Sequence, residues 1–199
     1  GGWDTSNVTD MGYMFNNASD FNQDISGWCV EQIQTEPSSF DTNSSLQFSF
    51  IPDWGRRCPI INPDFTLASN GVTCLCPDAS FGDKGTLTIN GEQKTFTKRT
   101  RSQLLNIDAN TNDLQISLTC TSGIIDMSAL FSATYSFNRS LIFWDTSNVT
   151  DMSGMFNNAS AFNGYIGGWD TSKVTTMGNM FNDAEEFNRD IGGWDTSNV

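Results

Sequence analysis

The chain has 199 residues, and its 37% hydrophobic and 12% aromatic content is enough to bury a core in one or two domains. Its net charge of −13 at pH 7 argues against nucleic acids and anionic membranes as partners, because phosphate binding needs clusters of basic side chains. The absence of histidine removes the commonest general base and the commonest transition-metal ligand, so the sequence offers little to an enzyme or a metal centre.

A 25-residue repeat organises the chain. The segment WDTSNVTDM at residues 3–11 returns at 144–152, returns with two changes at 169–177, and begins again at Trp194. A fixed period of this size predicts a solenoid in which successive coils stack. No apolar run approaches the roughly 20 residues that cross a bilayer, so direct membrane insertion is not expected.

Each repeat carries the same apolar positions, which predict a shared core. Spacings of three or four residues favour a short helical or 3-10 turn, whereas the FNxxIxxW end of each repeat favours an extended segment, a combination typical of leucine-rich-type coils. The predicted core ladder consists of Trp3, Phe15, Phe21, Ile25, Trp144, Phe156, Phe162, Trp169, Phe181, Phe187 and Trp194. The asparagine after each repeated Phe predicts a polar ladder that satisfies backbone groups, at Asn22, Asn138, Asn163 and Asn188.

Residues 29–58 interrupt the repeat and are rich in Ser, Asn, Pro and Phe. Because an open end of a repeat array exposes apolar surface, we expect this segment to be a C-terminal cap, closed by a disulfide between Cys29 and Cys58. The domain 1–58 would then be the last coil and cap of one array. Residues 59–63, PIINP, are the predicted linker.

Residues 64–122 predict a β-rich N-terminal cap for the solenoid coils at 123–199. Strands are expected at 72–76, 86–89, 94–98 and 114–118, with a hairpin turn at Asn90-Gly91 and one short helix at 101–107. A disulfide between Cys76 and Cys120 would tie this cap to the array. Cys74 is then left over, as a buried free thiol or an inter-chain link.

The first eight residues of the chain, GGWDTSNV, are identical to residues 192–199. If a longer parent chain repeats this unit, the super-period is 191 residues, from position 1 to position 192. The chain would then be a circular permutation of a natural domain that begins near residue 64.

The motifs resemble those of a known family. WDTSNVTDM followed by MFxxAxxFN is similar to the BspA-like surface proteins, whose roughly 25-residue repeat is related to leucine-rich repeats. Residues 28–30, 36–38 and 54–59 resemble that family's closing cap, and residues 71–73, 76–77, 97–99 and 120–124 resemble its opening segment. The resemblance implies a very long secreted or surface-anchored bacterial protein that takes part in attachment and has no catalytic motif. Cys74 departs from the pattern, since an apolar strand residue is expected there.

Charge is distributed unevenly along the sequence. Residues 56–101 carry a net charge of +3 and the remainder carries −16. A basic cap could dock on the acidic coils of a neighbouring copy and relieve their repulsion, through Lys94, Lys98, Arg99 and Arg101. The alternative is a solvated surface that keeps a secreted protein soluble.

The repeated aspartates allow two interpretations. Carboxylates stacked from coil to coil could hold Ca²⁺, at Asp4, Asp145, Asp170 and Asp195. The favoured interpretation is structural, because Asp-Thr-Ser-Asn is a turn sequence and Thr176 replaces one aspartate of a companion stack without disturbing the period. Glycoside hydrolysis by paired carboxylates is disfavoured, since an active site needs two different environments and the repeats offer near-identical ones. No cofactor is expected.

These features predict a mostly β fold with short helical or 3-10 turns, in which a leucine-rich-repeat-like solenoid carries a small β-rich cap module. We expect a non-enzymatic structural and adhesive module of an extracellular protein on a cell surface or appendage. Its partners would be tandem copies of itself and lateral neighbours in a rod or fibre. The alternative is a recognition module that binds host or prey proteins or glycans, because Gln23, Asp24 and Ser26 vary between near-identical coils.

Overall fold

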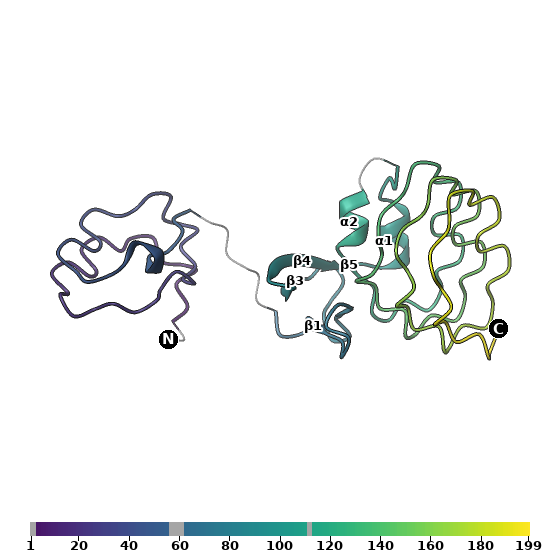
Figure 1. Ribbon diagram of the computed structural model, residues 1–199, viewed down its shortest axis with the longest axis horizontal. Helices are drawn as coiled ribbons and strands as arrows, with labels where there is room; N and C mark the ends of the chain where they lie inside the picture. The colour runs from purple at the N-terminus through teal and green to yellow at the C-terminus, as the bar shows by residue number, and fades with distance from the viewer. Residues whose placement is uncertain (1–2, 56–61, 111–112) are drawn as a thin grey trace. The chain divides into compact units, whose positions relative to one another are not determined.

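The computed structural model describes residues 3–55, 62–110 and 113–199 and divides the chain into two compact units, Gly1–Pro59 and Ile60–Val199 (Figure 1). The fold is mostly β, with two small sheets and a few short helices. None of the helices in the described ranges is long and apolar enough to span a membrane.

The first unit consists of the repeat at 3–28 and a covering segment at 29–55. Its regular element is the 3-10 helix η1 (Phe48–Phe50). Backbone N–H groups of the repeat donate to carbonyls one period further along the chain, as from Phe15 to Phe40 (2.8 Å) and from Ile25 to Phe50 (3.0 Å). Phe40 lies edge-on to Phe15, with ring centroids 5.3 Å apart, and is completely buried. The covering segment therefore packs on the repeat at the repeat's own period.

The covering segment also has the backbone conformation of the repeat, although its sequence does not resemble the repeat. Tyr13 and Asn17 have positive φ angles of 61° and 60°, and Ser39 and Asn43 repeat this pattern with 52° and 57°. The side chains that mark the repeat are mostly absent from 29–55, so the sequence shows an interruption where the backbone continues. Cys58 lies outside the described residues, and its pairing with Cys29 stays a prediction.

The second unit begins with two sheets. β1 (Thr66–Leu67) pairs antiparallel with β2 (Cys74–Leu75). In the other sheet β3 (Lys84–Ile89) pairs antiparallel with β4 (Glu92–Lys98), and β4 pairs in parallel with β5 (Thr119–Cys120). Asn90 and Gly91 both have positive φ, 52° and 82°, so they form the predicted hairpin turn.

Two short helices precede β5. α1 (Arg101–Leu105) is capped by Thr100, whose side chain accepts the N–H of Gln103 in a complete capping box. The prediction of a strand at 114–118 is wrong, because α2 (Asp113–Ser117) occupies this segment. The pattern LQISL fits both structures, since apolar residues at 114 and 118 are also four apart on a helix.

A disulfide joins Cys76 and Cys120, the second predicted pair, and Cys74 is a free, fully buried thiol. Burial raises the pKa of Cys74 to about 12, and the nearby charge of Asp145 adds to the shift.

The buried thiol gives a chemical prediction. Because the thiolate is the reactive form, Cys74 should resist a thiol-specific label at pH 8 in the folded protein and react fully in denaturant. Mass spectrometry of the labelled protein measures this. Rapid labelling of Cys74 under native conditions would contradict its burial.

The predicted leucine-rich-repeat-like solenoid is wrong. Within the described residues the regular strands lie between Thr66 and Cys120, and the repeats at 123–199 contain only isolated bridges, from Asp126 to Asp151 and from there to Thr176. Each repeat is instead a series of turns, with positive φ at two residues four apart, such as Asn179 and Asp183. Backbone hydrogen bonds join neighbouring repeats, but no regular strand forms among the described residues of 123–199.

Successive repeats nevertheless pack on one another (Figure 1). The N–H of Phe131 donates to the carbonyl of Met155 and that of Phe156 to Met180, with N–O distances of 2.8 and 2.9 Å. Rings at equivalent positions stack between repeats with centroids 5.5–5.8 Å apart in the Phe columns, which contain Phe131, Phe156 and Phe181, and Phe137, Phe162 and Phe187. The predicted core positions of the second unit thus form one continuous core.

Candidate functional site

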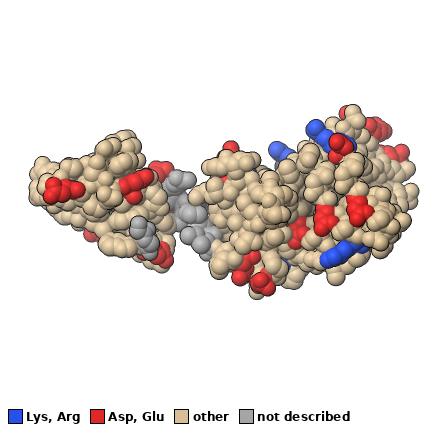
Figure 2. All heavy atoms as spheres, turned by 60° about the horizontal axis from the view of Figure 1, so that its bottom comes forward, with Lys and Arg blue, Asp and Glu red and all other residues tan. Residues whose placement is uncertain are grey.

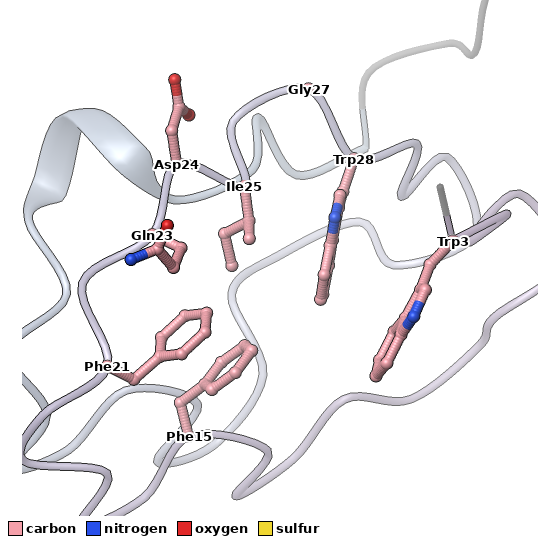
Figure 3. Close-up of a pocket in the computed structure, with 8 residues that line it drawn as sticks. All are labelled: Trp3, Phe15, Phe21, Gln23, Asp24, Ile25, Gly27 and Trp28. Carbon is pink, nitrogen blue, oxygen red and sulfur yellow. The ribbon is translucent and has the colours of Figure 1, made fainter. Parts of the chain in front are cut away.

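An aromatic hollow of about 470 Å³ opens in the first unit (Figure 3). It lies on one side of the repeat, while Phe40 and Trp54 cover the other side. Polar groups at its rim come from Gln23 and Asp24, and both are exposed. The residues that line it are Trp3, Phe15, Phe21, Gln23, Asp24, Ile25, Gly27 and Trp28.

The aromatic rings in the hollow are arranged as in the buried repeats of the second unit, but no further repeat covers them. Phe15 and Phe21 stack at 4.1 Å, as Phe156 and Phe162 do at 3.9 Å. Phe156 is completely buried, whereas Phe15 is half-buried and Trp3 is 68% exposed. The hollow therefore exposes apolar surface that a further repeat covers elsewhere in the protein.

A second hollow, of about 420 Å³, lies on the last repeat of the second unit. Met177, Phe181, Ile191 and Trp194 contribute to it, and all four are half-buried. Their equivalents one repeat earlier are buried, because this last repeat lies over them. The protein thus has two uncovered repeat faces, the hollow of 3–28, here called the head face, and the hollow of 169–196, here called the tail face.

The predicted asparagine ladder connects neighbouring repeats. The Oδ1 atom of Asn138 accepts the backbone N–H of Asn163 at 2.8 Å, and Asn163 accepts that of Asn188 at 3.1 Å. In the first unit Asn22 accepts the N–H of Gln47 at 3.2 Å, again one period further along the chain. Each asparagine therefore fixes the register of the next repeat.

The repeated aspartates close turns. Oδ1 of Asp145 accepts the backbone N–H and the hydroxyl of Ser147, and Asp170 binds Ser172 in the same way. The bonds from serine side chains and backbone two residues on lower the pKa of Asp4 and Asp195. Across the described ranges, no group of three or more His, Cys, Asp and Glu side chains is placed to hold a metal ion.

The four basic residues of the predicted docking surface make contacts within their own chain. The ammonium of Lys98 is buried and donates to the carbonyls of Cys76 and Pro77 at 2.8 and 2.9 Å. Lys94 forms an ion pair with Glu92 at 2.7 Å. These two cations are therefore already neutralised or buried, which leaves less charge for a neighbour than the sequence implies.

The two arginines are similarly engaged. Arg99 donates to the hydroxyl of Thr119 at 2.9 Å, and Arg101 lies 3.6 Å from a carboxylate oxygen of Asp126. In Figure 2 basic side chains are few on the face shown, and they lie on the second unit, whereas acidic side chains are found on both. The sequence from 1 to 55 contains eight Asp and Glu side chains and no Lys or Arg.

Comparison with known proteins identifies a family by its repeats. No curated protein and no solved structure matches the chain significantly. A family model matches residues 1–55 and 100–199, that is, the repeats of both units with α1, α2 and β5, and leaves out β1 to β4. Since this match covers most of the chain, the protein belongs to the family described as Mycoplasma protein of unknown function, DUF285.

Proposed function

We propose that the chain is a non-enzymatic structural and attachment module of an extracellular surface protein, and that it works by associating with copies of itself. The observation that carries this proposal is the pair of uncovered repeat faces. Both expose the apolar positions that hold neighbouring repeats together inside the second unit. Surface of this kind is normally covered by a partner.

The finer family relation belongs to the same proposal. The resemblance of the repeats to BspA-like surface proteins is compatible with the family membership and supports the proposal that the module belongs to a long, repetitive surface protein. The disulfide between Cys76 and Cys120 supports an extracellular location, because such bonds persist in oxidising compartments.

A second function, recognition of a glycan or of a host or prey protein, has its own support in the head face. Aromatic side chains beside exposed polar groups suit the amphipathic surface of a sugar, and Gln23 and Asp24 lie at the rim of the ring cluster. These two residues differ from their counterparts Gly164 and Tyr165 in the next copy of the repeat.

Sedimentation of the purified chain over a wide range of concentrations tests the first function. We expect the average mass to rise with concentration. Binding of the same preparation to immobilised glycans and surface proteins tests the second. A protein that stays monomeric at high concentration and binds a glycan would replace the first function by the second.

A further inference from the structure

We infer that the tail face of one copy binds the head face of a second copy, and that the pair repeats the contact between neighbouring repeats of the second unit. This inference rests on the proposed function and names the partner of its two faces. The occupant of each hollow is the opposite face of another copy of the chain.

The two Phe positions of the repeat correspond between the two faces. Phe181 and Phe187 extend the two Phe columns of the second unit and end them without a next ring. Phe15 and Phe21 occupy the same two positions of the repeat at 3–28 and lack a preceding ring. Placing one pair on the other continues both columns at the spacing of about 5.7 Å already present between Phe156 and Phe181.

The backbone edges are complementary in the same register. Inside the second unit, N–H groups at alternate residues donate to carbonyls of the next repeat, as from Gly154 to Gly178 and from Phe156 to Met180. On the tail face the equivalent N–H groups make no hydrogen bond within the described part of the chain. They are those of Met177, Asn179, Phe181 and Asp183.

On the head face the matching carbonyls accept no hydrogen bond within the described ranges. They belong to Asp10, Gly12, Met14 and Asn16. In the register of the repeat, Phe181 would donate to Met14 and Asn179 to Gly12. An open row of donors thus meets an open row of acceptors, which is the usual basis for pairing one chain with another.

The backbones that carry these groups have the same shape. Asn179 and Asp183 have φ angles of 56° and 57°, and Tyr13 and Asn17 have 61° and 60°. Because the turns match, the second copy can approach without a change in the backbone at these turns. The asparagine ladder would also continue, with Oδ1 of Asn188 accepting the N–H of Asn22.

The tryptophan stacks show that docking requires the first residues of the head face to move. Trp169 stacks on Trp194 with centroids 6.1 Å apart, and Trp3 stacks on Trp28 at 5.8 Å. In the docked pair, Trp194 of one copy and Trp3 of the other would occupy the same position next to Trp28. The reason is that residues 192–199 and 1–8 are identical in sequence and take the same place in the repeat. Residues 194–199 of one copy therefore replace 3–8 of the next, an exchange of identical segments that costs little in contacts.

The register can be tested by mixing chains that carry single cysteines. Asn182 and Asn16 would lie on adjacent repeats, as would Asn188 and Asn22. Neighbouring backbones about 4.8 Å apart bring such pairs within reach of a disulfide. We expect the mixture of Asn182→Cys with Asn16→Cys chains, and that of Asn188→Cys with Asn22→Cys chains, to form covalent heterodimers in a glutathione redox buffer.

Two matched controls use the same four variants in the wrong pairs. Asn182→Cys mixed with Asn22→Cys, and Asn188→Cys mixed with Asn16→Cys, should crosslink at least about tenfold more slowly, because their Cα atoms lie beyond disulfide reach. Equal rates in all four mixtures would overturn the inference. If the four rates are equal but the wild-type protein self-associates in the same buffer, the head-to-tail inference is wrong and the proposed function still holds. If the wild-type protein stays monomeric, the inference and the proposed function are both wrong.

Two further variants should strengthen the contact. Deleting residues 1–8 removes the competitor for the place over Trp28. Gln23→Gly removes a side chain at the position of Gly164, where an added Cβ would lie only 2.0 Å from the carbonyl oxygen of Arg139. We expect both changes to lower the concentration at which dimers appear in sedimentation, and weaker association in both would contradict the register.

Salt separates this contact from docking of the basic residues on acidic coils. Asp24 lines the head face, and Asp195 lies between the tail-face residues Trp194 and Thr196 in the chain, so screening should strengthen head-to-tail association or leave it unchanged. Docking through Lys94 and Arg101 would weaken as salt rises. Self-association that is lost at about 0.5 M salt would therefore overturn the inference in favour of the electrostatic contact.

Discussion

Replacement of Phe156 by alanine is expected to lower the free energy of unfolding by about 3–5 kcal/mol. Phe156 is completely buried at the centre of the second unit's core. Its ring stacks on Phe162 at 3.9 Å within the repeat, on Phe131 at 5.5 Å in the preceding repeat and on Phe181 at 5.7 Å in the next. The substitution thus removes one ring from three stacked contacts and leaves a cavity that the neighbouring turns cannot close.

The matched control is Phe181→Ala, at the same position of the last repeat. Phe181 is half-buried, so its loss should cost less than half as much. Unfolding in urea, followed by tryptophan fluorescence at low protein concentration, measures both changes. Equal effects at positions 156 and 181 would show that the last repeat is covered even in the dilute protein, and would contradict the exposed tail face.

The core positions were predictable because the repeat is nearly exact. Equivalent residues in identical local sequences take equivalent places, and the ring columns follow from the repeat period alone. The hairpin was predictable for a local reason, since Asn90-Gly91 provides the two positive φ angles that its turn requires. In both cases the determining residues are neighbours in sequence or copies of one another.

The regular structure of the repeats was not predictable in this way. The fixed repeat period indicates stacking, but it does not say whether the stacked segments are strands or turns. Ala129 and Ala133, which are not glycine, have positive φ angles in the part of the repeat where a short helical or 3-10 turn was predicted. Alanine gives no sequence signal for that conformation, so neighbouring repeats impose it.

The head and tail faces lay within the predicted core, and only the structure shows that they are uncovered. Phe15 and Phe156 have the same local sequence, yet one is half-buried and the other completely buried. The difference in burial depends on whether another repeat packs against each ring, and this cannot be deduced from the local sequence. The hydrogen-bond partners of Lys98 could not be predicted for the same reason. They are the carbonyls of Cys76 and Pro77, which are distant in sequence and are brought next to Lys98 only when the β-rich region folds.

Replacement of Cys76 and Cys120 together by alanine is expected to cost about 4 kcal/mol in the chain-entropy account of disulfides. The bond closes a loop with a sequence separation of 44 residues, which includes both strands of the hairpin and both helices. Without it the unfolded chain gains conformational freedom, while the packing around the buried residues stays largely in place. The matched control is Cys74→Ala, which removes a buried sulfur from the same cluster without opening a loop and should cost clearly less. Urea unfolding of the two variants beside the wild type gives both values, and a double variant as stable as the control would show that the crosslink contributes nothing to the stability of the second unit.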